Sequence, residues 1–369
     1  MGRQGRRRAC GVSPDCFRCD THIEQHPLNT VADRSEAAGQ YVPLRPMTDS
    51  ADTALPFPCA RFIKEIGRGP NGARALTPDD TRALYTAMLD GRVADLELGA
   101  VLLAYRVKGE TADELAAMLA GAHASFEPVH LPHGAFRPVS IPTYNGARKQ
   151  PNLVPLLALL LAREGVPVLV HGVTEDPGRV TSAEIFTHLQ IPHARSHADI
   201  EDGLAERRLA FAPIDVLAPK LARLLALRRR MGVRNSTHTL VKILQPFAPA
   251  GLRLVNYTHP PYRDSLTQLF NTHPDAAVGG ALLARGTEGE AVADTRRQVQ
   301  VDWLHDGICE TRVPHERSSP DAPEVDLPEA KDAPTTAAWI SAVLRGEAPV
   351  PSAIERQVEL IVDVARMPL

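Results

Sequence analysis

Residues 102–111 read Leu-Leu-Ala-Tyr-Arg-Val-Lys-Gly-Glu-Thr and, with the helix signals upstream of them, decide the fold. Thr77 is suited to cap a helix, because its hydroxyl can accept a free N–H of the first turn, and Pro78 is tolerated at the first helical position. Apolar residues then recur at helical spacing until Gly91, which favours a helix end. A second helix is predicted from Leu96 until just before Gly109, and a third begins at Thr111. The pattern predicts a compact helical unit.

Beyond Pro128, short apolar runs bounded by Gly and Pro alternate with helical segments, which is typical of a largely parallel sheet covered by helices. The predicted strands are Val166–Val170, Leu209–Ala212, Leu252–Tyr257, Ala277–Ala284 and Val299–Trp303. The predicted helices are Leu153–Arg163, Ser182–Leu189, Ala218–Arg230, Ser265–Phe270, Thr335–Leu344 and Ser352–Ala365. We therefore expect an α/β protein with a small helical domain at residues 57–127, a larger α/β domain with a mostly parallel sheet at 128–345, and a C-terminal helix at 346–369.

Residues 1–56 show neither helical nor strand periodicity, so we expect a disordered N-terminal extension. Cys10, Cys16, Cys19 and His22 could instead supply zinc ligands, but the second tight pair of ligands that is usual in such sites is missing. The basic N-terminus is followed by no apolar segment of a secretory signal, and no apolar run is long enough to cross a membrane. The 5 cysteines do not suggest a disulfide framework. These observations favour a cytoplasmic protein with no membrane partner.

The distribution of charge matters more than the formal net charge of −3. The segment 216–263 contains no Asp or Glu. It holds nine basic residues: Lys220, Arg223, Arg228, Arg229, Arg230, Arg234, Lys242, Arg253 and Arg263. A local positive field of this kind suits a polyanion, because charges act over short distances at physiological salt.

The segments Leu76–Asp79, Met88–Gly91 and Leu102–Thr111 together resemble the helical N-terminal region of anthranilate phosphoribosyltransferase and the related nucleoside phosphorylases. The resemblance extends, more weakly, to about residue 345. It implies the fold of that family, and also a homodimer, in which the helical domains pack together.

Two phosphate-binding motifs of this family are altered here. The family places a Gly-Thr-Gly-Gly-Asp loop after the first strand, whose backbone N–H groups cradle a diphosphate; the matching segment 141–152 keeps only Gly146 of the glycines. The family's Lys-His-Gly-Asn motif matches residues 170–173, where His171 and Gly172 remain and Val170 replaces the lysine. His171 fits a structural histidine as well as a contact in a ligand pocket.

The family's magnesium-binding acidic pair is also missing at the matching position, which is occupied by Ala291 and Val292. Glu288 and Glu290 lie close by and could replace this pair as metal ligands if the alignment with the family is shifted by a few residues. With all three motifs altered, we expect no catalytic residues, no metal and no cofactor.

Two segments, 143–150 and 234–242, resemble the YbiB branch of this family, which keeps the fold but binds nucleic acid. The candidate residues for contact with nucleic acid or phosphate are cations and uncharged donors in and near these segments. They are Thr143, Tyr144, Asn145, Arg148, Lys149, Arg229, Arg230, Arg234, Asn235, Ser236, His238 and Lys242.

The resemblance implies binding of DNA or RNA without sequence specificity, with single-stranded DNA as the expected ligand. Aromatic residues make up only 5% of the chain, so stacking on bases should contribute less than contact with phosphate. No pattern of a base-reading helix is visible. The alternative is a phosphoribosyltransferase or phosphorylase of altered substrate, with Arg148, Lys149 and Arg234 on the phosphate. A small phosphorylated metabolite as ligand is a third possibility.

Overall fold

The computed structural model describes residues 56–369 apart from 70, 133, 317–325 and 368–369. Contacts divide the chain into the segment Met1–Asp52 and a compact unit, Thr53–Leu369, to which all the described residues belong. The predicted N-terminal extension and the alternative zinc ligands Cys10, Cys16, Cys19 and His22 lie outside the described residues, except for residue 56.

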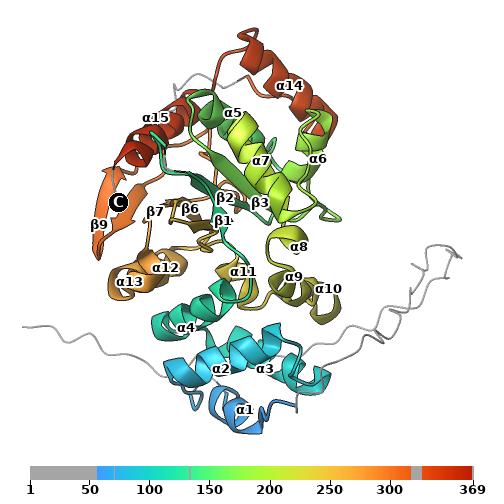
Figure 1. Cartoon of the computed structure of the whole chain (residues 1–369), viewed down its shortest axis with the longest axis vertical. Helices are drawn as coiled ribbons and strands as arrows, with labels where there is room; N and C mark the ends of the chain where they lie inside the picture. Colours follow the sequence, from blue (N-terminus) through green and yellow to red (C-terminus); the bar gives the residue numbers. More distant parts are fainter. Residues whose placement is uncertain (1–55, 70, 133, 317–325, 368–369) are drawn as a thin grey trace, which may run out of the picture. The chain divides into compact units, whose positions relative to one another are not determined.

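The first four helices form the helical unit. They are α1 (Ala60–Ile66), α2 (Pro78–Leu89), α3 (Asp95–Lys108) and α4 (Ala112–His123) (Figure 1). Helices α2 and α4 begin at the capping signals of the sequence. The Thr77 hydroxyl accepts the backbone N–H of Asp80, and Thr111 forms a reciprocal capping box with Glu114. The Glu114 carboxylate is fully buried, and it pairs with Lys108 at 2.6 Å and accepts the N–H of Leu76 at 3.0 Å. These contacts explain why the stretch from Lys108 to Thr111 determines the local fold.

A seven-stranded sheet forms the centre of the α/β part, in the order β4-β3-β2-β6-β7-β8-β9. The strands β2 (Val139–Thr143), β3 (Val168–Gly172), β4 (Leu209–Pro213), β6 (Leu252–Tyr257) and β7 (Ala281–Arg285) are parallel. The strands β8 (Val301–His305) and β9 (Ile308–Val313) are antiparallel. A separate two-stranded sheet pairs β1 (Val129–His130) with β5 (Phe247–Ala248). The predicted α/β class with a mostly parallel sheet is confirmed.

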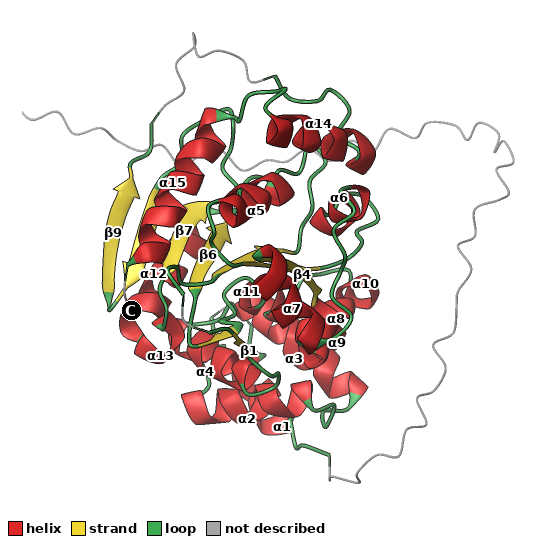
Figure 2. Cartoon of the chain, turned by 45° about the horizontal axis from the view of Figure 1, so that its top comes forward, coloured by secondary structure: helices red, strands yellow, loops and turns green. Residues whose placement is uncertain are grey.

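Helices from distant parts of the chain cover the sheet. The helices α5 (Val154–Arg163), α6 (Ser182–His188), α14 (Ala333–Arg345) and α15 (Ser352–Arg366) lie near one another beside the sheet (Figure 2). Their buried side chains share one apolar core with the sheet. The helices α7 (His197–Arg207) and α8 (Ile214–Leu217) pack on β3 and β4, while α12 (Pro260–Thr272) and α13 (Pro274–Ala277) pack on α4. The short helices α9 (Pro219–Ala226) and α11 (Thr237–Leu240) contact α2 and α4 respectively. The helices α1 to α4, together with α9 and α11, form a helical layer, which is thus built from two separate parts of the sequence.

Several predicted elements have different bounds in the structure. The single helix expected at Ala218–Arg230 breaks at Leu227 into α9 and α10 (Arg228–Met231). The strand expected at Ala277–Ala284 starts only at Ala281, because Gly279 and Gly280 turn the chain with positive φ angles of 83° and 71°. The helix expected at Ser265–Phe270 begins earlier, at Pro260, where proline suits the first turn. Other elements were not predicted: the helices α1, α7, α8, α11 and α13 and the strands β1, β2, β5 and β9.

Among the described residues, no helix is both long enough and apolar enough to cross a lipid bilayer.

Candidate anion-binding cleft

The candidate residues gather where the carboxyl ends of β2 and β3 meet the segment 234–242. In an open parallel sheet, loops that follow neighbouring strands lie at the same edge, which is the usual place for a ligand site. Thr143 ends β2, is 2% exposed, and bonds through its hydroxyl to Ser182 at 2.7 Å. Thr143 therefore supports the loop that follows it.

His171 is held in the protein interior and is 1% exposed. Its Nδ1 bonds to the Tyr144 hydroxyl at 2.7 Å and its Nε2 to the Ser140 hydroxyl at 3.0 Å. Burial lowers the pKa of His171 to about 3, so its imidazole is neutral. Burial also raises the pKa of Tyr144 well above its usual value. Tyr144 is 6% exposed, and little of its ring is available for stacking on a base.

Gly172, the neighbour of His171, is required by close packing. A Cβ atom at this position would lie 1.7 Å from the carbonyl oxygen of Thr143. Both residues of the retained His-Gly pair thus have structural roles in this chain, and Gly172 also lines the pocket described below.

The neutral, buried His171 predicts a protein that loses stability in mild acid. Its pKa is about 3 in the folded chain, against about 6.5 when unfolded. Below about pH 6.5 the unfolded chain therefore binds a proton that the folded chain does not, and stability falls as the pH is lowered. Between about pH 7.5 and 5.5 this effect should remove about 1.4 kcal/mol of unfolding free energy. Urea unfolding at both pH values should show a loss smaller by that amount in His171→Gln than in the wild-type protein. An equal loss in both proteins would contradict the assignment.

The side chains of Arg148 and Lys149 point away from the interior and are exposed. Neither has a hydrogen-bond or ion-pair partner among the described residues. Their backbone N–H groups, in contrast, donate to the carboxylate of Glu288, at 3.3 Å from Arg148 and 2.8 Å from Lys149. The two cations are thus free to meet an external anion while their backbone is fixed.

The segment 234–242 lies deeper than the sequence suggested. Arg234 donates to the Asn145 side chain at 2.8 Å, and burial, with Arg228 and other neighbouring cations, lowers its pKa. Lys242 donates to the carbonyl of Gly289 at 3.0 Å, and burial lowers its pKa to about 8. These two cations connect parts of the chain around the cleft.

The polar residues between them are also engaged. Asn235 is 5% exposed and donates to the carbonyl of Leu224 at 2.8 Å. The Ser236 hydroxyl donates to Glu110 of the helical layer. Burial lowers the pKa of His238 to about 4, so this ring is neutral at physiological pH. Roles for these residues in ligand contact remain predictions.

Three further cations belong to this cluster: Arg106 and Arg179 were not singled out by the sequence, and Arg228 was named only as one of the basic residues of the segment 216–263. Arg106, Arg179 and Arg228 all lie close enough to Arg234 to lower its pKa. Arg106 comes from α3 of the helical layer, and nothing in its helical pattern marks it as part of a site. Arg179 donates to the carbonyl of Gly146 at 3.1 Å, a contact that only the fold creates.

A pocket of about 560 Å³ opens beside this cluster. Its lining combines apolar side chains of α8 and α9 with polar groups of the loop after β3, and includes Tyr144, Arg228, Arg229 and His238. Arg229 pairs with Glu175 at 2.9 Å, but both side chains are largely exposed, so this ion pair is weak. The neighbouring Arg230 is exposed and has no ion-pair partner in the described part of the chain.

The other cations of the acid-free segment have structural partners. Lys220 pairs with Asp90 at 2.7 Å, Arg223 donates to the carbonyl of Leu89 at 2.6 Å, and Arg263 pairs with Asp302 at 2.8 Å. Arg253 is 1% exposed, in the core. The positive field at the cleft is therefore smaller than the count in the sequence implies.

The carboxyl groups of Glu288 and Glu290 face the loop that follows β2. Both carboxylates accept backbone N–H groups of the loop after β2, as detailed below. The positions of the family's acidic pair, Ala291 and Val292, are buried among apolar side chains. In the described residues, no group of three or more His, Cys, Asp or Glu side chains is placed to hold a metal ion.

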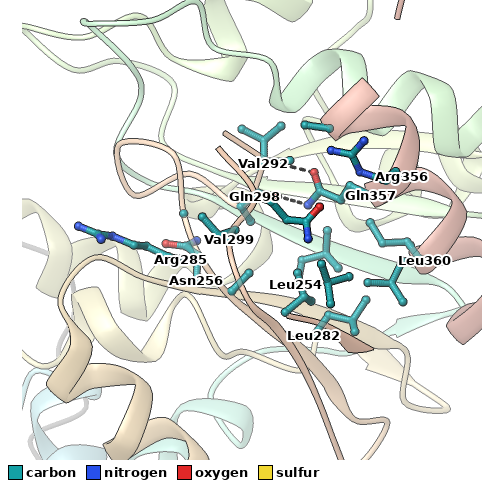
Figure 3. Close-up of a pocket in the computed structure, with 18 of the residues that line it drawn as sticks. Leu254, Asn256, Leu282, Arg285, Val292, Gln298, Val299, Arg356, Gln357 and Leu360 are labelled. Atoms are coloured by element: carbon teal, nitrogen blue, oxygen red, sulfur yellow. Dashed lines mark hydrogen bonds between the residues drawn. The ribbon is translucent and has the colours of Figure 1, made fainter. Parts of the chain in front are cut away.

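A second, smaller pocket of about 90 Å³ lies behind Ala291 and Val292, against α15 (Figure 3). Leu254, Leu282 and Leu360 line it with apolar surface. Gln357 accepts the N–H of Ala293 at 2.7 Å and so ties the segment after Glu290 to α15.

Comparison with known proteins agrees with this architecture. The helical bundle domain of the glycosyl transferase family matches residues 60–125. The chain is 43% identical over 300 residues to YbiB of Escherichia coli (strain K12), covering 80% of this chain and 91% of that protein. It is 31% identical over 189 residues to anthranilate phosphoribosyltransferase 2 of Ralstonia nicotianae, covering 51% of this chain and 53% of the relative.

Solved structures show the same fold. Anthranilate phosphoribosyltransferase of Thermus thermophilus superposes with a TM-score of 0.61 at 21% identity, over 82% of this chain and 87% of that one. The Saccharomyces cerevisiae enzyme, solved in complex with PRPP and Mg, gives a TM-score of 0.63 at 11% identity, over 83% and 88% of the two chains. The chain therefore belongs to the YbiB branch of the glycosyl transferase family that has the anthranilate phosphoribosyltransferase fold.

Proposed function

We propose that the cleft binds nucleic acid, preferably a single strand, without reading its sequence. The observation that carries this proposal is a set of exposed cations without partners in the described part of the chain. They are Arg106, Arg148, Lys149 and Arg230. Unpaired cations of this kind attract successive phosphates, and guanidinium groups bind phosphate with directed hydrogen bonds.

The arrangement favours a polymer over a small substrate. The free cations come from α3, the loop after β2 and α10, and so can meet several phosphates along one strand. Tyr144, an aromatic side chain in the candidate set, is buried, so affinity should come mainly from phosphate contacts. Bases then contribute little to selectivity.

Phosphoribosyl transfer fits the chain less well. Electrostatic stabilisation of a departing diphosphate requires donors and a metal aimed at it. Here the carboxyl groups of Glu288 and Glu290 accept the backbone N–H groups of the loop after β2, which would otherwise be the donors for a diphosphate. No described residue is assigned a catalytic role.

Two parallel titrations test the proposal at low salt. One uses a single-stranded oligonucleotide, and the other uses phosphoribosyl diphosphate with magnesium, followed by an assay of transfer to anthranilate. We expect saturable binding of the oligonucleotide and no transfer above background. Magnesium-dependent turnover that is abolished by Glu288→Ala or Glu290→Ala, without oligonucleotide binding, would show instead that the chain is an enzyme.

The proposal includes a homodimer that covers an exposed apolar stripe on α3. Leu96, Leu103 and Val107 lie on one face of this helix, since their spacing of seven and four residues returns to the same side. Their exposed fractions are 87%, 50% and 63%. The buried residues Val101 and Tyr105 lie on the opposite side, in the core. Such a stripe on a helix is suited to packing against its copy.

Changing Leu103 and Val107 to Glu should convert the dimer into monomers, because burying two carboxylates at the interface is costly. Light scattering after size-exclusion chromatography should give twice the mass of one chain for the wild type, and the mass of one chain for this variant. Ile308→Glu, which changes an exposed apolar residue of β9, is the control and should remain dimeric. A monomeric wild type would contradict the proposed dimer.

We also propose that the protein works in the cytoplasm. Cys59 and Cys309 are both free thiols, and Cys309 is exposed. A reducing compartment keeps such a thiol from oxidation.

A further inference from the structure

A tight turn, Gly286–Glu290, brings two carboxylates into the cleft. Thr287 and Glu290 exchange backbone hydrogen bonds of 3.1 and 2.9 Å, so Glu288 and Gly289 are the two central residues of a hairpin turn. Both have positive φ angles, 53° and 90°, as a type I′ turn requires. Asn-Gly and Asp-Gly are the preferred pairs in such turns. Glutamate at the first position is strained, which suggests that contacts of its side chain offset the cost.

Those contacts are backbone N–H groups of the loop that follows β2. The Glu288 carboxylate accepts the N–H groups of Lys149 at 2.8 Å, Gln150 at 3.0 Å and Arg148 at 3.3 Å. Glu290 Oε1 accepts those of Asn145 at 2.8 Å and Gly146 at 2.6 Å. The N–H groups of one loop thus converge on two carboxyl groups of another loop, and burial raises the pKa of the one on Glu290. Convergent backbone N–H groups of this kind form a binding site for anions such as phosphate.

The turn is also fixed at its base and its tip. A Cβ atom on Gly289 would lie 1.7 Å from the Asn145 side-chain nitrogen, so the turn presses directly on the loop. Lys242 holds the carbonyl of Gly289, and Arg179 lies 3.8 Å from the Glu288 carboxylate. On the far side, the Gln357 side chain of α15 accepts the backbone N–H of Ala293.

We infer that the Glu288 carboxylate is a built-in anion that, beside the buried carboxyl group of Glu290, fills a cradle able to hold a small multivalent anion such as diphosphate. The filled cradle excludes free diphosphate from the loop. External phosphates are then left to the exposed side chains around it, which selects a polyanion over a small phosphorylated ligand. The selectivity for a polyanion rests on the proposed function. The occupation of the cradle by glutamate side chains does not depend on it.

Emptying part of the cradle tests the inference. Glu288→Gly removes the carboxylate at a position whose φ angle suits glycine, so the turn should be retained. Glu175→Gly removes an exposed carboxylate of the same cleft and leaves the cradle filled, so it isolates the effect of charge. Isothermal titration with inorganic diphosphate, without metal, should show binding to Glu288→Gly at least about tenfold tighter than to Glu175→Gly or the wild type.

A second variant is used if Glu288→Gly does not fold, which the lack of a cooperative urea-unfolding transition would show. Glu288→Gln keeps the side-chain length and one acceptor oxygen but loses the charge, and its diphosphate affinity should lie between those of Glu288→Gly and the wild type. Equal affinity of the wild type and the Glu288 variants for diphosphate would overturn the inference. Titration of the same proteins with an oligonucleotide separates the two ideas, because a wild type that binds no oligonucleotide contradicts the proposed function alone.

Discussion

Replacing Arg106, Arg148, Lys149 and Arg230 together with alanine should weaken oligonucleotide binding by roughly 10²- to 10³-fold at about 50 mM salt. These side chains are exposed and unpaired among the described residues, so each is available to neutralise a phosphate. Each phosphate neutralised on a single strand contributes about −0.7 to the slope of log affinity against log salt. The variant should therefore flatten this slope by about two to three. Fluorescence anisotropy over a series of salt concentrations measures both quantities.

The matched control changes the same amount of charge at exposed positions that do not line the cleft. It replaces Arg74, Arg163, Lys331 and Arg356 with alanine. We expect this control to change affinity by less than about threefold, since long-range charge effects are screened. Similar losses in both variants would mean that net charge alone governs binding and that the cleft is not the site.

Arg234 and Lys242 call for a different expectation from the one that the sequence suggested. From sequence, both should act as phosphate contacts and flatten the salt dependence when removed. In the structure Arg234 bonds to Asn145, and Lys242 bonds to Gly289. Their replacement should first lower stability, because it leaves buried groups around the cleft without partners.

Arg253→Met should lower the free energy of unfolding by about 3 to 5 kcal/mol. Its guanidinium is 1% exposed and donates to the carbonyls of Ile243 and Val278 at 3.0 Å and of Gly280 at 3.4 Å. Methionine fills much of the same volume but leaves these carbonyls without their donors. Burial lowers the pKa of Arg253 to about 9, which reflects how far its charge is removed from water.

Urea unfolding monitored by circular dichroism measures this loss. Arg285→Met, on the neighbouring strand β7, changes an exposed arginine and is the control, with an expected effect within about 0.5 kcal/mol. A loss below about 1 kcal/mol in Arg253→Met would show that the carbonyls find other partners.

The sequence predicted the fold where local chemistry determines it. Thr77 and Thr111 mark helix starts through hydrogen bonds to residues three positions away, and such short-range signals are visible in the chain itself. The alternation of strands and helices likewise predicted the parallel sheet. The break of the expected helix at Leu227 was missed, because no Gly or Pro marks it in the sequence.

The site was predicted less completely, because its chemistry depends on partners far away in sequence. The acid-free segment suggested a continuous positive field, but Lys220, Arg223 and Arg263 face partners in other elements and Arg253 is in the core. Arg148 and Lys149 are exposed, as a phosphate-binding role requires.

The role of Glu288 was also hidden. In the sequence, Glu288 is one of two glutamates beside the position where Ala291 and Val292 replace the family's magnesium-binding acidic pair. Only the fold shows that it lies against backbone N–H groups about 140 positions away. Glu288 has a positive φ angle in a hairpin turn, and the sequence contains no Asn-Gly or Asp-Gly pair there from which this turn could be predicted.

The most direct test of the central claim is a salt titration of the wild-type protein with two single-stranded oligonucleotides of equal length and unrelated sequence. Binding through phosphate predicts that both bind at low salt with similar affinity, and that log affinity falls linearly with log salt at a slope of about −2 or steeper. No binding at low salt would contradict the account. So would a slope near zero, or binding of only one of the two sequences.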